Sequence, residues 1–261
     1  MWDIWFSGVL ILLILSVIFG YRFLEHRVGY RAAERLRIGQ MAAFLILFSV
    51  HGGTLLGGSV FAGLLGTAFA GTLLIEWTGV RWGWFFGRYR YTDTACILPA
   101  VGGVPLCYPI AWAGLIYAGF WTSLLWLPPS GGVVHLSVPF IGLTALEVTV
   151  LDFILDPIAV DEGRWVWQRQ GRYYGVPWTN FAGWFSTVVV ILLAVRWEMG
   201  SRLAIHTPSH WALIYPGLGY GLLAAITVRV CRERQLKIPA WLGGATALLT
   251  LGRIVWLQIL P

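Results

Sequence analysis

The chain has 261 residues, of which 58% are hydrophobic and 11% are charged, and its formal net charge at pH 7 is +6. Soluble domains carry about 25% charged residues, so the composition excludes an ordinary soluble domain and predicts an integral membrane protein. The basic residues fall between apolar stretches instead of along one polar face. They therefore indicate membrane topology and exclude a nucleic-acid partner.

Eight stretches approach the ~20 apolar residues that cross a bilayer. In chain order they are expected at about 3–24, 36–52, 58–78, 104–127, 134–155, 178–196, 210–230 and 239–260. No basic segment precedes the first stretch, which predicts a retained helix and not a cleavable signal. The pattern predicts an all-α, polytopic membrane helical bundle that forms a single integral membrane domain over residues 1–261, with seven or nine helices as the alternatives to eight.

The connections between these spans differ in charge. Fifteen of the 18 Lys and Arg residues fall in the first, third, fifth and seventh connections. Cytoplasmic connections are enriched in Lys and Arg, so these four are expected at the cytoplasmic face of the cell (inner) membrane and both termini on the other side. The two connections that are richest in polar motifs, after the third and fifth spans, then share one face.

A carboxyl group, Glu76, lies near the end of the third span and begins the segment EWTGVRWGWFFGRYRY at residues 76–91. Its glycines recur every four residues, a spacing that allows close backbone approach, and Tyr89 and Tyr91 end it. A carboxyl group beside tyrosines and arginines predicts either an acid held in a hydrogen-bond network or a salt bridge. The sequence does not choose between them.

The fifth span contains three carboxyl groups, at Glu147, Asp152 and Asp156. A charge in mid-bilayer costs about 2.5–3.5 kcal/mol on the insertion scale, so such residues usually face the bundle interior and have a partner or a function. Asp152 and Asp156 share a helix face, whereas Glu147 and Asp152 diverge by about 140°. The helix is expected to end near Asp156, which precedes Pro157 and has a turn or an ion pair with Arg164 as its structural alternative.

Aromatic and amide side chains crowd the next connection and the start of the sixth span. The candidate substrate-binding residues are Tyr89, Tyr91, Trp112, Trp165, Trp167, Tyr173, Tyr174, Asn180 and Trp184. An interfacial aromatic belt explains some of them. It does not explain Asn180 beside Trp184 at the start of a span.

Cysteine and histidine spacing indicates no further chemistry. The three cysteines show no CxxC or Cys/His pattern, so they are expected to be small buried hydrophobic residues and not disulfides or zinc ligands. The five histidines form no ligand pair near the acids. Neither a metal nor another cofactor is expected.

Over roughly residues 72–186 these motifs resemble the carotenoid biosynthesis membrane proteins of the CruF type, hydratases that act on the acyclic ψ end of carotenoids. The resemblance rests on Glu76 with its glycines and tyrosines, on PAVGGVPLCYPIAW at 99–112, and on the run from Asp152 to Trp184. It implies the addition of water to the terminal double bond of a linear carotenoid such as γ-carotene or lycopene. The implied partners are that carotenoid, water and the bilayer, with other enzymes of carotenoid biosynthesis as further candidates.

Such a reaction needs a neutral acid that protonates the alkene and a site that protects the tertiary carbocation until water arrives. We expect Asp152 as the acid, Asp156 or Glu76 as its partner or base, and Glu147 as the rival donor. Aromatic faces can stabilise the cation. The alternatives are an enzyme like the membrane lycopene cyclases, a transporter, and a carotenoid-binding protein without turnover.

Overall fold

The structure, a computed structural model, describes residues 9–10, 12–13, 16, 27–206 and 210–259. Within this part of the chain it contains seven long helices, and six of them are long and apolar enough to cross a membrane. The first expected span, at 3–24, lies outside the described residues apart from isolated positions. The expected helical membrane bundle is confirmed for the rest of the chain.

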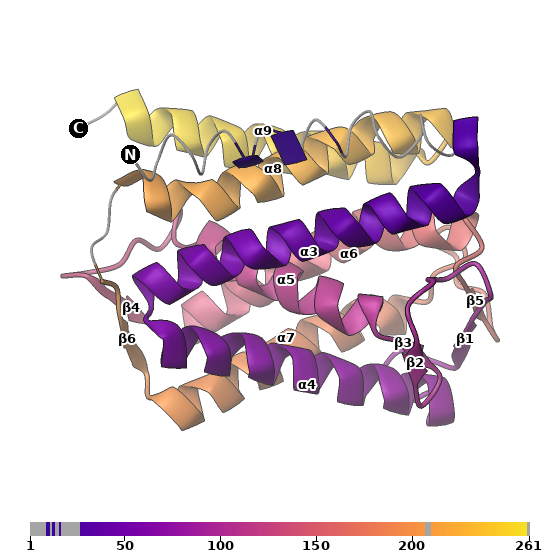
Figure 1. Cartoon of the computed structure of the whole chain (residues 1–261), viewed down its shortest axis with the longest axis horizontal. Coiled ribbons are helices and arrows are strands. Elements are labelled where there is room, and N and C mark those ends of the chain that lie inside the picture. The colour runs from indigo at the N-terminus through magenta and orange to yellow at the C-terminus, as the bar shows by residue number, and fades with distance from the viewer. Residues whose placement is uncertain (1–8, 11, 14–15, 17–26, 207–209, 260–261) are drawn as a thin grey trace.

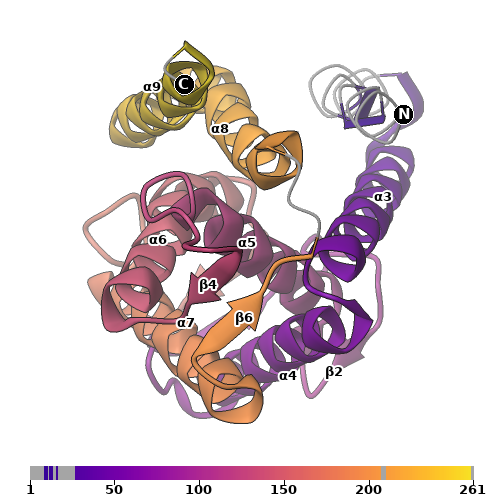
Figure 2. The ribbon, with the colours of Figure 1, turned by 90° about the vertical axis from the view of Figure 1, so that its left-hand side faces the viewer.

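The seven later spans correspond one to one to these helices. In chain order the helices are α3 (Tyr30–Leu55), α4 (Gly58–Trp82), α5 (Cys107–Ser123), α6 (Val138–Asp161), α7 (Trp178–Met199), α8 (His210–Glu233) and α9 (Lys237–Ile259). They run along the long axis of the molecule, with α8 and α9 side by side at one edge (Figure 1). Figure 2 shows this pair set beside a bundle of α4, α5, α6 and α7.

The break between α3 and α4 is a short glycine turn. α3 ends at Leu55 and α4 begins at Gly58. Gly57 between them has φ +81°, a conformation that glycine adopts without steric cost. At its other end α4 stops at Gly83, which has φ +74° and closes the helix with a left-handed residue.

The central helix, α5, is shorter than expected. It covers 17 residues, or about 26 Å, because a hairpin precedes it and a turn follows it. Ile116, Phe120 and Trp121 are fully buried, and the helix packs against α3, α4, α6 and α8. A helix surrounded in this way is apolar on every face, which explains why its sequence looked like a longer span.

The end of α6 also differs from the prediction. The helix continues through Pro157 to Asp161, whereas we expected it to end near Asp156. A helical proline cannot donate to the carbonyl four residues earlier, which here belongs to Phe153. The Tyr173 hydroxyl donates to that carbonyl instead, at 3.1 Å, so the carbonyl freed by the proline is satisfied and the helix continues.

Three two-stranded antiparallel ladders join the connections at the two ends of the bundle. They are β1 (Tyr89–Tyr91) with β5 (Trp165–Trp167), β2 (Ala100–Val101) with β3 (Val104–Pro105), and β4 (Val133–His135) with β6 (Arg202–Ala204). The β1·β5 ladder pairs Tyr89 with Trp167 and Tyr91 with Trp165. It therefore confirms that the two motif-rich connections meet at one end (Figure 1), and β4·β6 crosses the other end (Figure 2).

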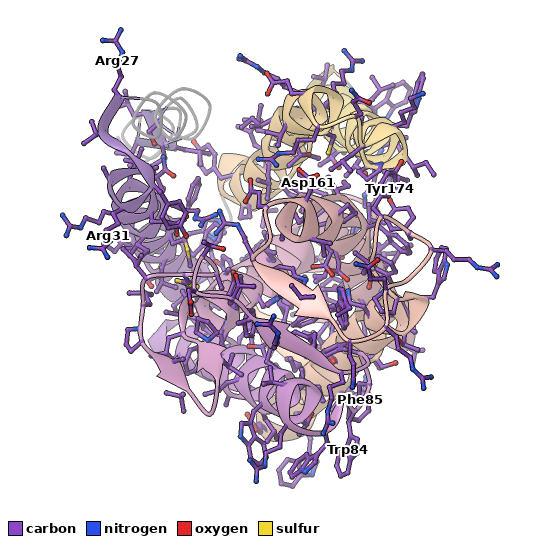
Figure 3. The ribbon with its side chains drawn as sticks, turned by 90° about the vertical axis from the view of Figure 1, so that its right-hand side faces the viewer. Arg27, Arg31, Trp84, Phe85, Asp161 and Tyr174 are labelled. Atoms are coloured by element: carbon purple, nitrogen blue, oxygen red, sulfur yellow. A yellow bond between two sulfur atoms is a disulfide. The ribbon has the colours of Figure 1, made fainter. Side chains whose placement is uncertain are left out.

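The β1·β5 end also contains the start of α3 and the α8–α9 turn, so the basic connections lie together (Figure 1). Figure 3 views this end and shows Arg27 and Arg31 pointing outward at one edge and Trp84 and Phe85 protruding at another. Trp84 is 57% exposed, as expected of an aromatic anchor in the membrane interface. The assignment of this end to the cytoplasmic face stays a prediction from the charge pattern.

Two side-chain links hold the connections at this end. Arg164 is buried and donates to Glu162 at 2.5 Å, to Glu34 of α3 at 3.4 Å and to the carbonyl of Ala95 at 3.0 Å. Burial opposes its charge, but the neighbouring carboxylates, Glu162 foremost, keep the pKa of Arg164 above its usual value.

The second link corrects an expectation about cysteine. Cys96 and Cys107 form a disulfide with their Cα atoms 6.8 Å apart, although neither was expected to be paired. The β2·β3 hairpin between them brings the two residues together, and no spacing motif in the sequence reports such a loop. Cys231 is free and buried, as expected.

Candidate active site

Three carboxyl groups meet inside the bundle near the β1·β5 end. Glu76 of α4 and Asp152 and Asp156 of α6 are each no more than 4% exposed. Glu76 and Asp156 lie about 8–9 Å along their helices from the ends at Trp82 and Asp161, and Asp152 lies about 14 Å from the same end of α6. Both helices end at the β1·β5 ladder, so they place their acids at similar depth.

The cluster has no cationic partner among the described residues. All ion pairs in this part of the chain involve other carboxylates. Breaking a buried ion pair is costly because one charge is left uncompensated. Three buried acids without a cation would carry the same cost if they were charged, so they are unusual as purely structural residues. Neutral hydrogen-bond donors hold them instead.

Asn180 joins the two aspartates. It lies in the first turn of α7, where its backbone N–H donates to the carbonyl of Pro177 at 3.0 Å. Its side-chain Nδ2 donates to Asp152 Oδ2 at 2.9 Å and to Asp156 Oδ2 at 2.8 Å. One amide group therefore holds both carboxyl groups together in a buried site, and two adjacent buried carboxyl groups cannot both ionise at low cost.

Glu76 is held in a different way. Its Oε2 accepts hydrogen bonds from the hydroxyl of Tyr89 and, at 2.7 Å, from that of Tyr91. Burial raises the pKa of Tyr89 and Tyr91 well above the usual value, and the nearby Glu76 raises both further. Both hydroxyls therefore stay protonated and act as donors, so Glu76 belongs to a hydrogen-bond network and not to a salt bridge.

A small cavity separates Glu76 from the Asp156–Asn180 side. It is lined by Glu76, Tyr89, Tyr91, Tyr108, Trp112, Asp156, Trp165, Trp167, Asn180 and Trp184. Its volume is about 20 Å³, and a cavity above ~10–15 Å³ can hold a water molecule. Asp152 is not among the lining residues and reaches the cavity through Asp156 and Asn180.

Aromatic rings form most of the wall. Trp112 stacks on Trp184 with ring centroids 3.7 Å apart, and Phe86 stacks on the same Trp184 at 5.1 Å. On another side Tyr91 stacks on Tyr108 at 4.7 Å. Such π faces attract cations, so the wall suits a reaction that develops positive charge.

One indole in this wall has an unsatisfied donor. Trp167 is 5% exposed, and its Nε1 has no hydrogen-bond partner among the described residues. Its ring lies 4.8 Å from that of Tyr89. Buried polar groups normally have a partner, so this N–H in the wall of a water-sized cavity indicates a place for a small polar ligand.

The structure thus brings together most of the predicted site. Three of the four predicted catalytic acids and seven of the nine predicted substrate-binding residues lie at the cluster. The seven are Tyr89, Tyr91, Trp112, Trp165, Trp167, Asn180 and Trp184. Among the described residues, no group of three or more His, Cys, Asp or Glu side chains is arranged to hold a metal ion.

The structure does not bring Glu147 to this cluster. The hydroxyl of Tyr220 in α8 donates to the Glu147 carbonyl at 2.8 Å, so this residue belongs to the α6–α8 contact. The divergence of about 140° between positions five apart on a helix is the physical reason. Glu147 is therefore removed from the proposed set of proton donors.

Tyr173 and Tyr174 also lie outside the cavity wall. Tyr173 donates to the Phe153 carbonyl, as described above, and the Tyr174 hydroxyl accepts from the backbone N–H of Ile238 in α9 at 3.1 Å. Both tyrosines thus support α6 and α9 outside the cavity wall, and their role as substrate-binding residues stays a prediction. Figure 3 shows Tyr174 near the α8–α9 turn.

Sequence reasoning did not identify two aromatic residues of the site, one in the cavity wall and one packed against it. Tyr108 lines the cavity and stacks on Tyr91, and Phe86 stacks on Trp184. Tyr108 stands four residues before Trp112, so the two share a helix face, and this spacing was the available signal. No comparable signal marks Phe86, which lies in a turn.

The residues of this site lie within a region that is similar to a known protein family. A family model described as carotenoid biosynthesis protein matches residues 36–250. The chain belongs to this family. The match contains every residue of the cluster and confirms the resemblance seen over residues 72–186.

A curated relative narrows the comparison. The chain is 36% identical over 121 residues to a bisanhydrobacterioruberin hydratase of Haloarcula japonica. The match covers 46% of this chain and 39% of the relative, so it spans about two-fifths of that protein's length. No solved structure matches the chain.

Proposed function

We propose that this protein is a carotenoid hydratase that adds water to the terminal C=C bond of an acyclic (ψ) carotenoid end group. The observation that supports the proposal best is the cavity with room for one water molecule between Glu76 and Asp156, in a wall of aromatic rings. Family membership and the hydratase among the relatives support the same reaction class. The water-sized cavity favours hydration over cyclisation, which needs no water.

In the first step Asp156 donates a proton to the terminal double bond. It lines the cavity and shares the Asn180 donor with Asp152, and since two adjacent buried carboxyl groups cannot both ionise at low cost, the pair keeps a proton to donate. A new C–H bond forms, the π bond is lost, and the charge resides on the tertiary carbon. Asp152, which we first expected as the donor, lies behind Asp156 and supports it as the other half of the pair.

In the second step water attacks the cation and Glu76 takes a proton from it. Two neutral donors on Glu76, the hydroxyls of Tyr89 and Tyr91, stabilise its carboxylate form, and Glu76 lines the same cavity as Asp156. A C–O bond forms, the oxonium loses its proton to Glu76, and the tertiary alcohol leaves. The proton on Glu76 then replaces the one that the aspartate pair gave up, so the net reaction consumes one water and no oxidant.

The substrate end group is larger than one water molecule, so its entry requires the ring wall to open. We propose lateral entry of the polyene between helices, with its end beside Trp112 and Trp184. A carotenoid of about 30 Å matches the thickness of the hydrocarbon core. Closure of the rings around the end group leaves room for only the reacting water, which protects the cation from side reactions.

The test is expression in cells that produce lycopene, followed by mass analysis of the pigments. The proposal predicts a product heavier by one water per modified end, and its loss in Asp156→Asn and Glu76→Gln. An isomer of unchanged mass would indicate a cyclase and overturn the proposal. Unchanged pigments, with the folded protein present in the membrane, would favour a transporter or binding protein.

A further inference from the structure

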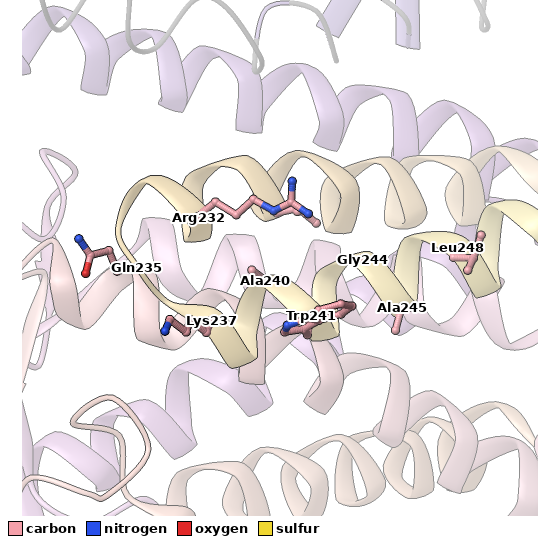
Figure 4. Close-up of a pocket in the computed structure, with 9 residues that line it drawn as sticks. Arg232, Gln235, Lys237, Ala240, Trp241, Gly244, Ala245 and Leu248 are labelled. Atoms are coloured by element: carbon pink, nitrogen blue, oxygen red, sulfur yellow. The ribbon is translucent and has the colours of Figure 1, made fainter.

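A second cavity, of about 650 Å³, lies on the surface of α8 and α9 away from the acid cluster (Figure 4). Most of its wall is apolar, and two cations stand at the end that contains the α8–α9 turn. We call it the α8–α9 groove and define it by Val228, Arg232, Lys237, Trp241, Gly244 and Leu248. Nothing in the proposed hydration mechanism uses it.

The cations of the groove differ from their neighbours. Arg229 pairs with Glu233 at 3.0 Å, and Arg234 pairs with Asp161 at 2.5 Å. Arg232 and Lys237, which line the groove, form no ion pair with any described residue and are exposed. Two uncompensated positive charges at the mouth of an apolar groove complement an anionic head on an apolar chain.

The length of the groove fits one leaflet. Lys237 begins α9 and Leu248 lies 11 residues later, which is about 16 Å along the helix. Half of a hydrocarbon core of about 30 Å is about 15 Å. An acyl chain whose head group sits at Lys237 therefore ends near Leu248.

The side chains of the groove suit this depth. Trp241 lies one turn from Lys237 and is 81% exposed, and Leu248 is 75% exposed. Tryptophan prefers the interface and leucine the hydrocarbon. At Gly244 an added Cβ would meet only the Val228 side chain, at 4.0 Å, so the missing side chain keeps the groove open between these two residues.

We propose that the α8–α9 groove binds one anionic phospholipid, with its phosphate on Arg232 and Lys237 and one acyl chain along Trp241, Gly244 and Leu248. The groove shares no lining residue with the cavity at the acid cluster, so lipid binding can be tested independently of the proposed reaction. Basic pockets between membrane helices are known binders of anionic head groups. The apolar continuation selects a phospholipid over free phosphate.

The probe is phosphatidylglycerol against phosphatidylcholine, measured as lipid retained on the full-length protein by native mass spectrometry from mixed-lipid nanodiscs. Wild-type protein is expected to retain phosphatidylglycerol preferentially. Arg232→Gln with Lys237→Gln should weaken that retention by roughly 10- to 30-fold, since each cation near the surface contributes about 1 kcal/mol. The matched control is Arg169→Gln with Arg172→Gln, which removes two exposed charges from the same end and should change nothing.

A second pair of variants tests the apolar half of the groove. Gly244→Leu fills it and should reduce retention, whereas Gly252→Leu on the same helix also enters open space and should not. Equal retention of the two lipids by wild-type protein would overturn the proposal, as would full retention in the double variant at Arg232 and Lys237. Displacement by inorganic phosphate alone would also contradict it, because the site would then be a phosphate site.

Discussion

The two ends of the bundle have the same kind of strand ladder but differ in the polar side chains that are buried beneath it. At each end a ladder of three-residue strands joins two connections, β1 with β5 at one and β4 with β6 at the other. Beneath β1·β5 lie three buried acids held by neutral donors. At the β4·β6 end the buried polar side chains include His51 and Tyr117, which lie 2.6 Å apart, and the carboxyl group of Glu198 is exposed and accepts from Thr67 at 3.0 Å.

In the proposed mechanism the buried carboxyl groups carry the chemistry, whereas the ladders have a structural role. Both ladders close the helix ends with backbone hydrogen bonds, which any sequence of suitable shape can provide. In the part of the chain that the structure describes, buried acids without an ion pair occur only at the β1·β5 end. Changes at the acid end should therefore remove activity at little cost in stability, and matched changes at the other end should do the reverse.

The largest effect is expected from neutralising an acid. Asp156→Asn and Glu76→Gln should each lower hydration by about 10²-fold or more, the usual contribution of a general acid or base. Tyr117→Phe, which removes a hydroxyl at the opposite end, should leave the rate within a few-fold of wild type. Rates are compared at equal amounts of folded protein, and an active Asp156→Asn variant would remove the proposed donor.

A smaller effect is expected from the aromatic wall. Trp184→Leu removes a π face beside the cavity and should slow the reaction roughly 30-fold, since a desolvated cation–π contact contributes about 2 kcal/mol. Phe140→Leu at the other end removes a buried ring that meets Phe120 at 5.1 Å and should lower thermal stability without slowing turnover. Equal slowing in both variants would show that the rings act through packing alone.

The hydrogen bond from the Tyr173 hydroxyl to the Phe153 carbonyl can be tested by a double-mutant cycle with Pro157. Tyr173→Phe leaves the Phe153 carbonyl without its donor and should cost about 1–3 kcal/mol of stability. Pro157→Ala restores a backbone N–H for the same carbonyl, so in that background the loss of the hydroxyl should cost much less. Additive losses in denaturation measurements would mean that the hydroxyl does not substitute for the missing helical bond.

The smallest effect concerns alkaline pH. The pKa of Tyr91 is raised in the folded protein, so above about pH 10 the unfolded chain releases a proton that the folded protein keeps. Stability then falls as the pH rises through that range. Tyr91→Phe should show a shallower fall between about pH 9 and 11, and an unchanged slope would contradict the buried, protonated state of this tyrosine.

Hydropathy predicted the helices that follow residue 27 because a bilayer imposes a length on each span. The charge pattern also predicted that the segments around Tyr89 and Trp165 lie at one end, and the structure confirms it. The ladder that joins them was not predictable, since strands of three residues carry no periodicity. The extension of α6 past Pro157 was missed because it depends on Tyr173, a residue distant in the sequence.

Within the site, helical spacing was informative where two residues share one helix. It paired Asp152 with Asp156 and separated Glu147 from them. It could not show that Asp156 and not Asp152 lines the cavity, because that depends on the position of Asn180 in the neighbouring helix. It could not show that Tyr173 and Tyr174 support helices outside the cavity wall, because a tyrosine that supports a helix and one that binds a ligand look alike in sequence.

The most direct test of the account is the fate of solvent oxygen. Purified protein in lipid is incubated with an acyclic carotenoid in water enriched in heavy oxygen, and the product is analysed by mass spectrometry. The account predicts one heavy-oxygen hydroxyl group on each reacted end, formed by wild-type protein and not by Asp156→Asn. A product without solvent oxygen, or an equal yield from both proteins, would contradict it.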